Sequence, residues 1–300
     1  MVRRLAAHER ATICGLAGVL VAAGGASVLP VLPAVQASLV YPVDVVAMGD
    51  GVVVADFKAH GLLAIDSAGS VSAIAIGNGL PRTPLYGTRA VLDAPDGDGW
   101  LVADPATSSL YRVRADGSIM TITDAVDIPQ GLARFDDSSV LVSDLRSGIG
   151  AVMKVGLDGE VSVFAEIDSP KGIVEDGDGG FALVSHGDRA VVRLSRGGDV
   201  STLHRGAPLL FPHDLVRLPS GDFVVSDGYA HALFTVSAEG EVTALAQGAP
   251  LIAPQGIARL ANGTLIVVDP QAGAVFRVAP DGAVRPWVAV QGAGVGPARR

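Results

Sequence analysis

Short runs of apolar residues, broken by glycine, aspartate, asparagine and proline, recur along most of this chain. Residues 52–55 (VVVA) form one such run, and residues 110–113 (LYRV) and 242–245 (VTAL) form two more. Runs this short, bounded by turn-forming residues, predict β-strands joined by hairpin turns. Because the run at 52–55 does not alternate apolar and polar positions, it predicts a strand that is covered on both faces.

These runs belong to one unit that is written six times. A polar residue ends the second run of each unit at steps of 40 to 48 residues: Asp56, Asp104, Asp144, His186, Asp227 and Asp269. A glycine turn keeps nearly the same step: Gly69, Gly117, Gly159, Gly198, Gly240 and Gly282. Because two independent markers share one period, we interpret the chain as a structural repeat of four short strands.

A four-stranded sheet with two apolar faces needs neighbours to cover it. Packing such sheets around an axis covers the faces and leaves short edges, which is the β-propeller arrangement. The sequence therefore predicts an all-β, six-bladed β-propeller with four antiparallel strands per blade, in one domain over residues 38–300. The expected blades are about 43–76, 88–123, 129–166, 170–205, 212–247 and 254–289. How the ring closes is left open, because no segment outside the blades offers a strand for exchange.

The first 37 residues predict an export signal. A basic start with Arg3 and Arg4 precedes an apolar stretch over residues 11–32, which ends in a small-residue cleavage pattern at Ala37. We expect cleavage there and a periplasmic or extracellular mature chain. An uncleaved N-terminal membrane anchor is the alternative, since the stretch is long enough to span a bilayer. Cleavage would also remove Cys14, the single cysteine.

Composition excludes several functions. The formal net charge of −9 argues against a nucleic-acid partner, because phosphate binding needs a basic surface. One cysteine rules out a disulfide framework and a cysteine-based zinc site. The sequence shows no phosphate-binding loop or dinucleotide motif. We therefore expect a monomer with no cofactor and no metal, and with no membrane partner after cleavage.

The residue between proline and glycine in the first strand of each unit is the main candidate for function. In a propeller these positions ring the mouth of the central channel, and they hold Val43, Arg89, Gln130, Lys171, His213 and Gln255. Asp44 and Asp214 stand where other units have glycine. Convergent polar groups over a channel suit a small molecule. The predicted ligand-binding residues are Arg89, Gln130, Lys171, His186, Asp214, Gln255 and Asp44.

The repeated aspartates have a structural interpretation. An aspartate that recurs before a loop usually accepts hydrogen bonds from the backbone of that loop. We expect this role for Asp56, Asp104, Asp144, Asp227 and Asp269. His186 breaks the series, and both a loop histidine and a site residue remain open for it.

The fifth unit carries the strongest candidate for catalysis. His213 and Asp227 lie fourteen positions apart, at the two ends of one predicted hairpin. A carboxylate beside an imidazole raises its basicity and fixes its tautomer. His213 is therefore predicted as a general base, with Asp227 as its acidic neighbour.

The repeated pattern Pro-x-Gly-Ile/Leu-Ala, Asn/Asp-Gly, Val-x-Asp, Phe-Arg-Val, Asp-Gly resembles the NHL repeat. It also resembles the SMP-30/gluconolactonase and strictosidine-synthase-like six-bladed propellers, most clearly over residues 129–282. These folds host lactonases, lyases, cyclases and binding scaffolds, so the resemblance implies an architecture more than an activity. The segment around His213 is similar to the streptogramin B lyases, in which a Pro-His-Gly segment supplies a catalytic histidine and a glutamate ends the next strand.

The gluconolactonase resemblance does not carry its metal site. That family binds a divalent cation through Glu, Asn and Asp side chains at the channel mouth. The matching positions here hold Val43, Gln130 or Lys171, and His213. These side chains do not make an oxygen cage, so we predict no metal of that kind.

Two functions follow from the sequence. The first is an exported propeller that binds a small polar or anionic ligand, or a protein loop, at the channel mouth. The alternative is a metal-independent lyase, cyclase or hydrolase that uses His213 as general base. The sequence favours binding, because a catalytic function needs more support than one histidine with one acidic partner.

Overall fold

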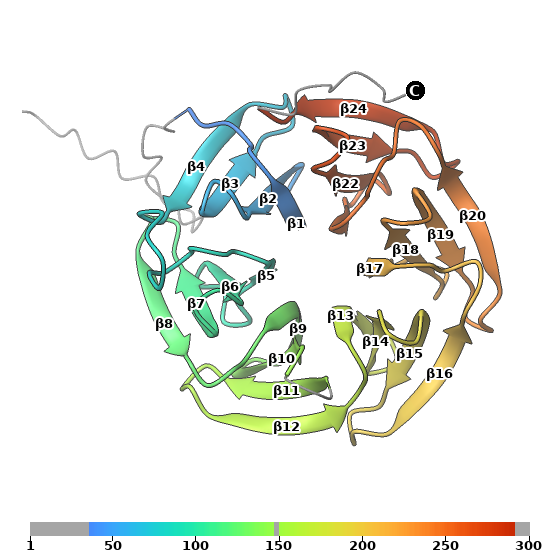
Figure 1. Cartoon of the computed structure of the whole chain (residues 1–300), viewed down its shortest axis with the longest axis horizontal. Helices are drawn as coiled ribbons and strands as arrows, with labels where there is room; N and C mark the ends of the chain where they lie inside the picture. Colours follow the sequence, from blue (N-terminus) through green and yellow to red (C-terminus); the bar gives the residue numbers. More distant parts are fainter. Residues whose placement is uncertain (1–35, 147–149, 292–300) are drawn as a thin grey trace, which may run out of the picture. The chain divides into compact units, whose positions relative to one another are not determined.

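The computed structural model describes residues 36–146 and 150–291, and these form six four-stranded antiparallel sheets around a central axis (Figure 1). The prediction of an all-β, six-bladed propeller is confirmed. In each blade the first strand lies beside the axis and the fourth lies at the rim. Within the described ranges, no helix is long and apolar enough to cross a membrane. The predicted export signal lies almost entirely outside the described residues.

The strands of each blade are consecutive in the chain. Blades 1 and 2 comprise β1 (Pro42–Met48), β2 (Gly51–Asp56), β3 (Gly61–Ile65), β4 (Val71–Ile76), β5 (Ala90–Asp93), β6 (Trp100–Asp104), β7 (Ser109–Val113) and β8 (Ile119–Thr123). Blades 3 and 4 comprise β9 (Pro129–Asp136), β10 (Ser139–Asp144), β11 (Ala151–Gly156), β12 (Val161–Glu166), β13 (Pro170–Asp176), β14 (Gly180–Ser185), β15 (Ala190–Leu194) and β16 (Val200–Arg205). Blades 5 and 6 comprise β17 (Pro212–Arg217), β18 (Phe223–Asp227), β19 (Ala232–Val236), β20 (Val242–Gln247), β21 (Ile257–Arg259), β22 (Leu265–Asp269), β23 (Ala274–Val278) and β24 (Val284–Ala289).

The second strands are buried on both faces, as their unbroken apolar runs predict. Every residue of β2, β10, β18 and β22 is buried. Val52 and Val54 of blade 1 pack in one cluster with Ile266 of blade 6, so each sheet is covered by its neighbours. Burying an aliphatic or phenyl side chain contributes about 1.5–3 kcal/mol. Burial between sheets therefore holds the ring together.

The repeated glycines mark the tight turn between the third and fourth strands. All six have positive φ, between 81° and 95°. Residues other than glycine adopt this region of φ only at a cost in conformational free energy, because their Cβ atom clashes with the backbone. The turn thus explains the most regular marker of the sequence repeat.

The aspartates that end the second strands hold the preceding loop by hydrogen bonds. Asp56, for example, accepts bonds from the backbone N–H groups of Val40, Tyr41 and Ala59, at 2.7 to 3.0 Å. The predicted turn role is confirmed for Asp56, Asp104, Asp227 and Asp269, which accept bonds from N–H groups of the loop that follows them. Asp144 accepts a bond of 2.6 Å from the N–H of Ile128, in the loop before β9.

Blade 4 corrects the sequence alignment of this marker. Ser185 pairs with Pro170 as Asp56 pairs with Pro42, so Ser185 and not His186 occupies the aspartate position. The Ser185 hydroxyl donates a bond of 2.6 Å to the carbonyl of Asp168. His186 is the next residue, in the loop that follows β14. The spacing of the repeat could not reveal this error, because choosing Ser185 or His186 gives the same pair of steps, 41 and 42 residues, to the neighbouring units.

The ring closes without exchange of a strand. The N–H of Gly256, just before β21, donates to the carbonyl of Val43 in β1 at 3.1 Å. The N–H of Gln291 donates to the carbonyl of Leu39 at 2.8 Å. Leu39 is fully buried in the cluster shared by blades 1 and 6. The segment before β1 therefore fastens the first blade to the last.

Candidate functional site

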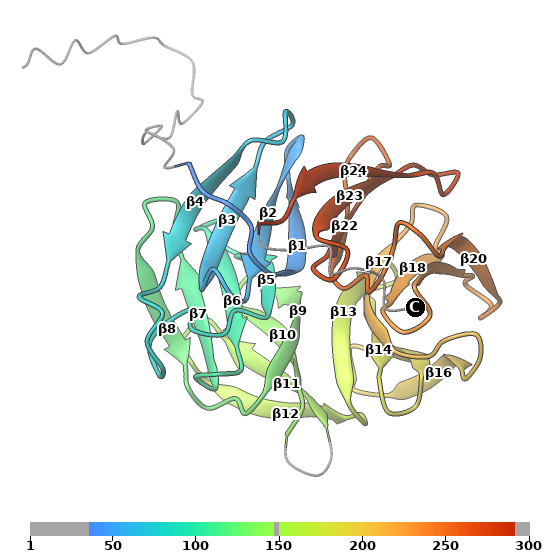
Figure 2. The same ribbon diagram turned by 45° about the horizontal axis from the view of Figure 1, so that its top comes forward.

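The inner strands surround a cavity of about 360 Å³ on the propeller axis. Figures 1 and 2 show β1, β5, β9, β13 and β17 as the innermost strands of their blades. The structure brings all six variable positions of the repeat to its wall, together with the two aspartates that replace glycine: Val43, Asp44, Arg89, Gln130, Lys171, His213, Asp214 and Gln255. Two other predicted site residues, His186 and Asp227, lie beside this lining.

Two cations of the mouth bind the amide oxygens of two glutamines. Arg89 Nη1 donates to Gln255 Oε1 at 3.2 Å, which links blade 2 to blade 6. Lys171 Nζ donates to Gln130 Oε1 at 2.6 Å, which links blade 4 to blade 3. Both acceptors are neutral, so these bonds position the cations without cancelling their charge.

Lys171 is a buried cation with a strongly lowered pKa. Only 8% of the residue is exposed. Burial, and then the positive charge of Arg89, lower the pKa of its amine from 10.5 to about 7. Within residues 36–146 and 150–291, its one hydrogen-bond or ion-pair partner is the Gln130 oxygen. A protonated lysine has three N–H donors, so the amine in its protonated form has donors and charge left for a ligand.

The uncharged imidazole rings of His213 and His186 lie side by side at one edge of the mouth, with their centroids 5.5 Å apart. Burial is the main cause that lowers the pKa of His213 to about 2, with Arg89 and then Lys171 adding to it. Burial likewise lowers the pKa of His186 to about 3. Nδ1 of His213 and Nε2 of His186 are buried and have no hydrogen-bond partner in the described part of the chain. Both rings are therefore uncharged at neutral pH, and His213 lines the cavity.

Phe211 and Tyr229 complete this edge and were missed by the sequence analysis. Their rings stack with centroids 4.3 Å apart, and Phe211 meets His213 edge-on at 5.1 Å. Tyr229 is 67% exposed. The signal was present as an aromatic residue directly before Pro212 and another two positions after Asp227.

The predicted partnership of His213 with Asp227 is wrong. The Asp227 carboxylate is fully buried and accepts bonds from the backbone N–H groups of Leu210 and Phe211, at 2.7 to 2.9 Å. It also accepts from Tyr229 and Ala230, which makes it the anchor of two loops. The pKa of His213 follows burial and nearby cations instead. Asp227 is thus a structural residue.

This correction predicts the effect of removing the carboxylate. Asp227→Ala leaves several buried N–H groups without an acceptor, so we expect the free energy of unfolding to fall by about 3 kcal/mol. Asp137→Ala is the control, because the Asp137 side chain is 90% exposed and pairs only with Arg134 at the surface. Urea unfolding of both variants measures the difference. Equal stability of the two variants, with a changed titration of His213, would restore the catalytic pairing.

Asp44 and Asp214 lie next to the cationic mouth, one residue further along their strands. Asp44 accepts a bond of 2.8 Å from the N–H of Val91, in blade 2. Asp214 accepts one of 3.0 Å from the N–H of Ile257, in blade 6. Burial and then the charge of Asp214 raise the pKa of Asp44 well above its usual range. Burial raises the pKa of Asp214 to about 6, although its backbone bonds oppose this.

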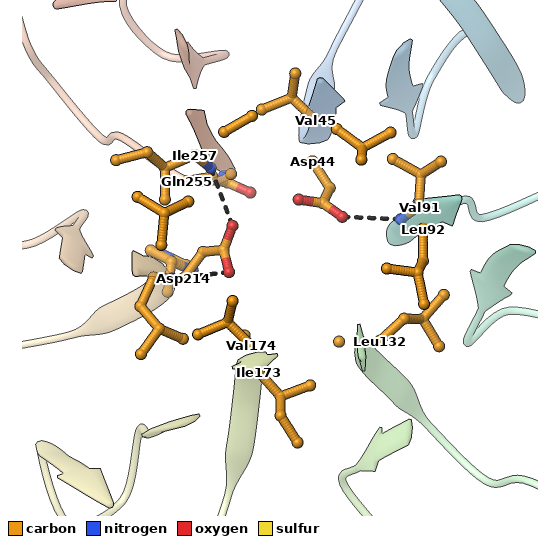
Figure 3. A pocket seen from close by; sticks show the side chains of 18 of the residues that line it. Asp44, Val45, Val91, Leu92, Leu132, Ile173, Val174, Asp214, Gln255 and Ile257 are labelled. Atoms are coloured by element: carbon orange, nitrogen blue, oxygen red, sulfur yellow. Dashed lines mark hydrogen bonds between the residues drawn. The ribbon is translucent and has the colours of Figure 1, made fainter. Parts of the chain in front are cut away.

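The cavity therefore combines three groups of side chains. The cationic ring is the set of mouth positions that carries Arg89 and Lys171, and the acidic pair is Asp44 and Asp214. The third group is an apolar wall. Figure 3 shows the two carboxyl groups inside a ring of apolar side chains that includes Val45, Leu92 and Val174. Among the described residues, no three His, Cys, Asp or Glu side chains are grouped closely enough to hold a metal ion. The arrangement is chemically suited to hold a small molecule that carries charge.

The chain resembles solved propellers over most of its length. A catalytically inactive histidine-to-alanine variant of virginiamycin B lyase from Staphylococcus aureus, bound to quinupristin, is 15% identical over 87% of this chain and 88% of its own, with a TM-score of 0.65. A gluconolactonase from Xanthomonas campestris is 15% identical over 79% and 86%, with a TM-score of 0.62. An auxiliary nutrient-binding protein from Bacteroides thetaiotaomicron is 14% identical over 78% and 68%, also with a TM-score of 0.62.

These comparisons establish the fold and nothing finer. No family model matches the sequence, and no curated protein does. The resemblance to lyases and gluconolactonases that the repeat predicts is confirmed as a structural one. At such low identity the shared architecture does not transfer an activity.

Proposed function

We propose that this propeller binds a small anionic ligand, with a carboxylate or a similar oxyanion, at the mouth of its channel. The buried amine of Lys171, whose described partner is a neutral amide oxygen, is the observation that carries the proposal. A buried cation is costly unless it is paired. An anion at this point would supply the missing charge and accept the remaining N–H donors.

Arg89 and the size of the cavity support the same conclusion. A guanidinium presents donors in a planar fork that matches a carboxylate. Arg89 and Lys171 line the same cavity, and the charge of Arg89 lowers the pKa of Lys171, so an anion in this cavity would be attracted by both cations. The cavity of about 360 Å³ lies in the range of small-molecule sites, roughly 300–1,000 Å³. A nutrient-binding protein shares this architecture.

Catalysis by His213 is the second candidate. Its unpartnered Nδ1 in the cavity wall favours this role, as does the fold shared with virginiamycin B lyase. A general base works best when its pKa lies near the operating pH. The pKa of His213, lowered to about 2 by burial and by Arg89, makes the ring a weak base. The geometry therefore supports binding better than proton abstraction.

Removing both cations tests the proposal. The probe is 4-methylpentanoate, a small carboxylate with an apolar chain. We expect Arg89→Ala with Lys171→Ala to weaken its binding at least about tenfold, since each charge-assisted bond contributes about 1.5–3 kcal/mol. Isothermal titration calorimetry of the purified protein at neutral pH measures the affinity. Arg285→Ala is the matched control, because Arg285 is an exposed cation on the outer strand β24. Unchanged affinity in the double variant would end the proposal.

A further inference from the structure

Asp44 and Asp214 form a second charged group, in the layer below the cationic ring. They replace glycine in blades 1 and 5, on either side of blade 6. Asp44 lies against Gly256 on one side and bonds to blade 2 on the other. Asp214 lies against Gly172 of blade 4 and bonds to blade 6. Both carboxyl groups are half-buried, and both line the channel.

The two carboxyl groups repel each other and are only partly neutralised. The charge of Asp214 is the second largest cause of the raised pKa of Asp44, after burial. The positive charge of Arg89 lowers the pKa of both, although its guanidinium is bonded to Gln255. A cation placed between the two carboxyl groups would relieve this repulsion. The acidic pair thus offers negative charge to a cationic group of a ligand, whereas Lys171, one layer above, offers positive charge to an anionic group.

The cationic and acidic positions occupy neighbouring residues along the inner strands. Val43 and Asp44 are consecutive in β1, as are His213 and Asp214 in β17, and one residue of a strand spans about 3.3 Å. The carboxylate and the ammonium of an α-amino acid are attached to one carbon atom and are separated on this scale. A ligand of that type is therefore matched in scale to two neighbouring layers of side chains in one cavity.

The wall beyond the aspartates fits an apolar side chain. Val46, Leu92, Val174 and Val216 are half-buried and line the same cavity. We infer that the ligand is an α-amino acid with an apolar side chain, its carboxylate at Lys171 and Arg89 and its ammonium at Asp44 and Asp214. This inference rests on the proposed function and specifies the ligand class of the same site.

Three compounds of one shape test the inference. L-leucine carries both charges, 4-methylpentanoate lacks the ammonium, and 3-methylbutylamine lacks the carboxylate. We expect calorimetry at neutral pH to show that leucine binds the wild-type protein at least tenfold more tightly than either single-charge compound. In the double variant Asp44→Asn with Asp214→Asn, which keeps a side-chain oxygen for the N–H groups of Val91 and Ile257, the ratio of leucine to 4-methylpentanoate affinity should fall to about one. Asp116→Asn, in an exposed turn, should keep the wild-type ratio.

Proton exchange gives a second measurement that needs no variant. An ammonium between the carboxyl groups releases a proton from them, whereas a carboxylate at Lys171 takes one up. In buffers of different ionisation enthalpy, leucine should therefore show less proton uptake than 4-methylpentanoate. Equal affinity and equal uptake for the two compounds would overturn the zwitterion and leave anion binding intact. If neither carboxylate bound, the proposed function itself would fall.

Discussion

Replacing Lys171 by methionine is expected to stabilise the fold while weakening anion binding. The pKa of the buried amine, lowered from 10.5 to about 7, corresponds to an unfavourable free energy of up to about 5 kcal/mol when it is protonated. Methionine has a similar length and no charge to desolvate. Because the bond to Gln130 is lost at the same time, we expect the free energy of unfolding to rise by about 2 kcal/mol.

The gain should depend on pH in a defined direction. Between pH 7 and 10.5 the unfolded chain holds a proton on Lys171 that the folded chain has released, so wild-type stability rises with pH across this window. The penalty is fully present below pH 7 and disappears above pH 10.5. Urea unfolding at about pH 6 and about pH 10 should therefore show a large advantage of Lys171→Met at the lower pH and little at the higher.

An exposed lysine provides the control for this experiment. Lys58 lies at the surface near the ring of Tyr41, and Lys58→Met should change stability by less than about 0.5 kcal/mol at both pH values. A pH-independent gain in Lys171→Met would mean that the effect comes from apolar packing alone. A loss of stability would mean that the ammonium has a counter-charge in the fold. A gain together with weakened binding would show that the site retains an unfavourable charge for function.

The ring of site residues was predictable because it follows from the repeat. Each unit places the same repeat position, which follows a proline in five units and Thr88 in the second, at or just before the innermost strand, so six copies around an axis converge on one cavity. Lys171 and Arg89 were identified in this way without knowledge of any distance. Asp44 and Asp214 were identified because they interrupt a glycine position. Equivalent positions of the repeat occupy equivalent places around the axis, so the place of a residue in its unit predicts its place in the fold.

The errors arose where the repeat carries no information. His186 was assigned to the aspartate position because loops vary in length, and only strand pairing shows that Ser185 stands there. Asp227 was given a partner because hairpin ends lie close together, yet its oxygens are used by backbone N–H groups. The low pKa of His213 depends on cations from blades 2 and 4. Such contacts between blades are not encoded in a local pattern.

Gly172→Ala is expected to be strongly destabilising, although it adds a single methyl group on an inner strand. A Cβ atom at Gly172 would lie 2.6 Å from the Cα of Asp214, and it would also collide with the Asp214 carboxylate. Backbone cannot yield as a flexible side chain does, so blades 4 and 5 would have to separate. We expect the free energy of unfolding to fall by about 3 kcal/mol, at the upper end for overpacked sites.

The matched control is Gly197→Ala, in the exposed turn before β16. A Cβ atom there meets nothing closer than 3.5 Å, so stability should change by less than about 0.5 kcal/mol. Thermal and urea unfolding of both variants measure the contrast. If Gly172→Ala were as stable as Gly197→Ala, Asp214 would not lie against blade 4. The acidic pair would then have no fixed place beside the cationic ring, because the missing side chain at Gly172 is what lets a carboxylate enter the channel wall.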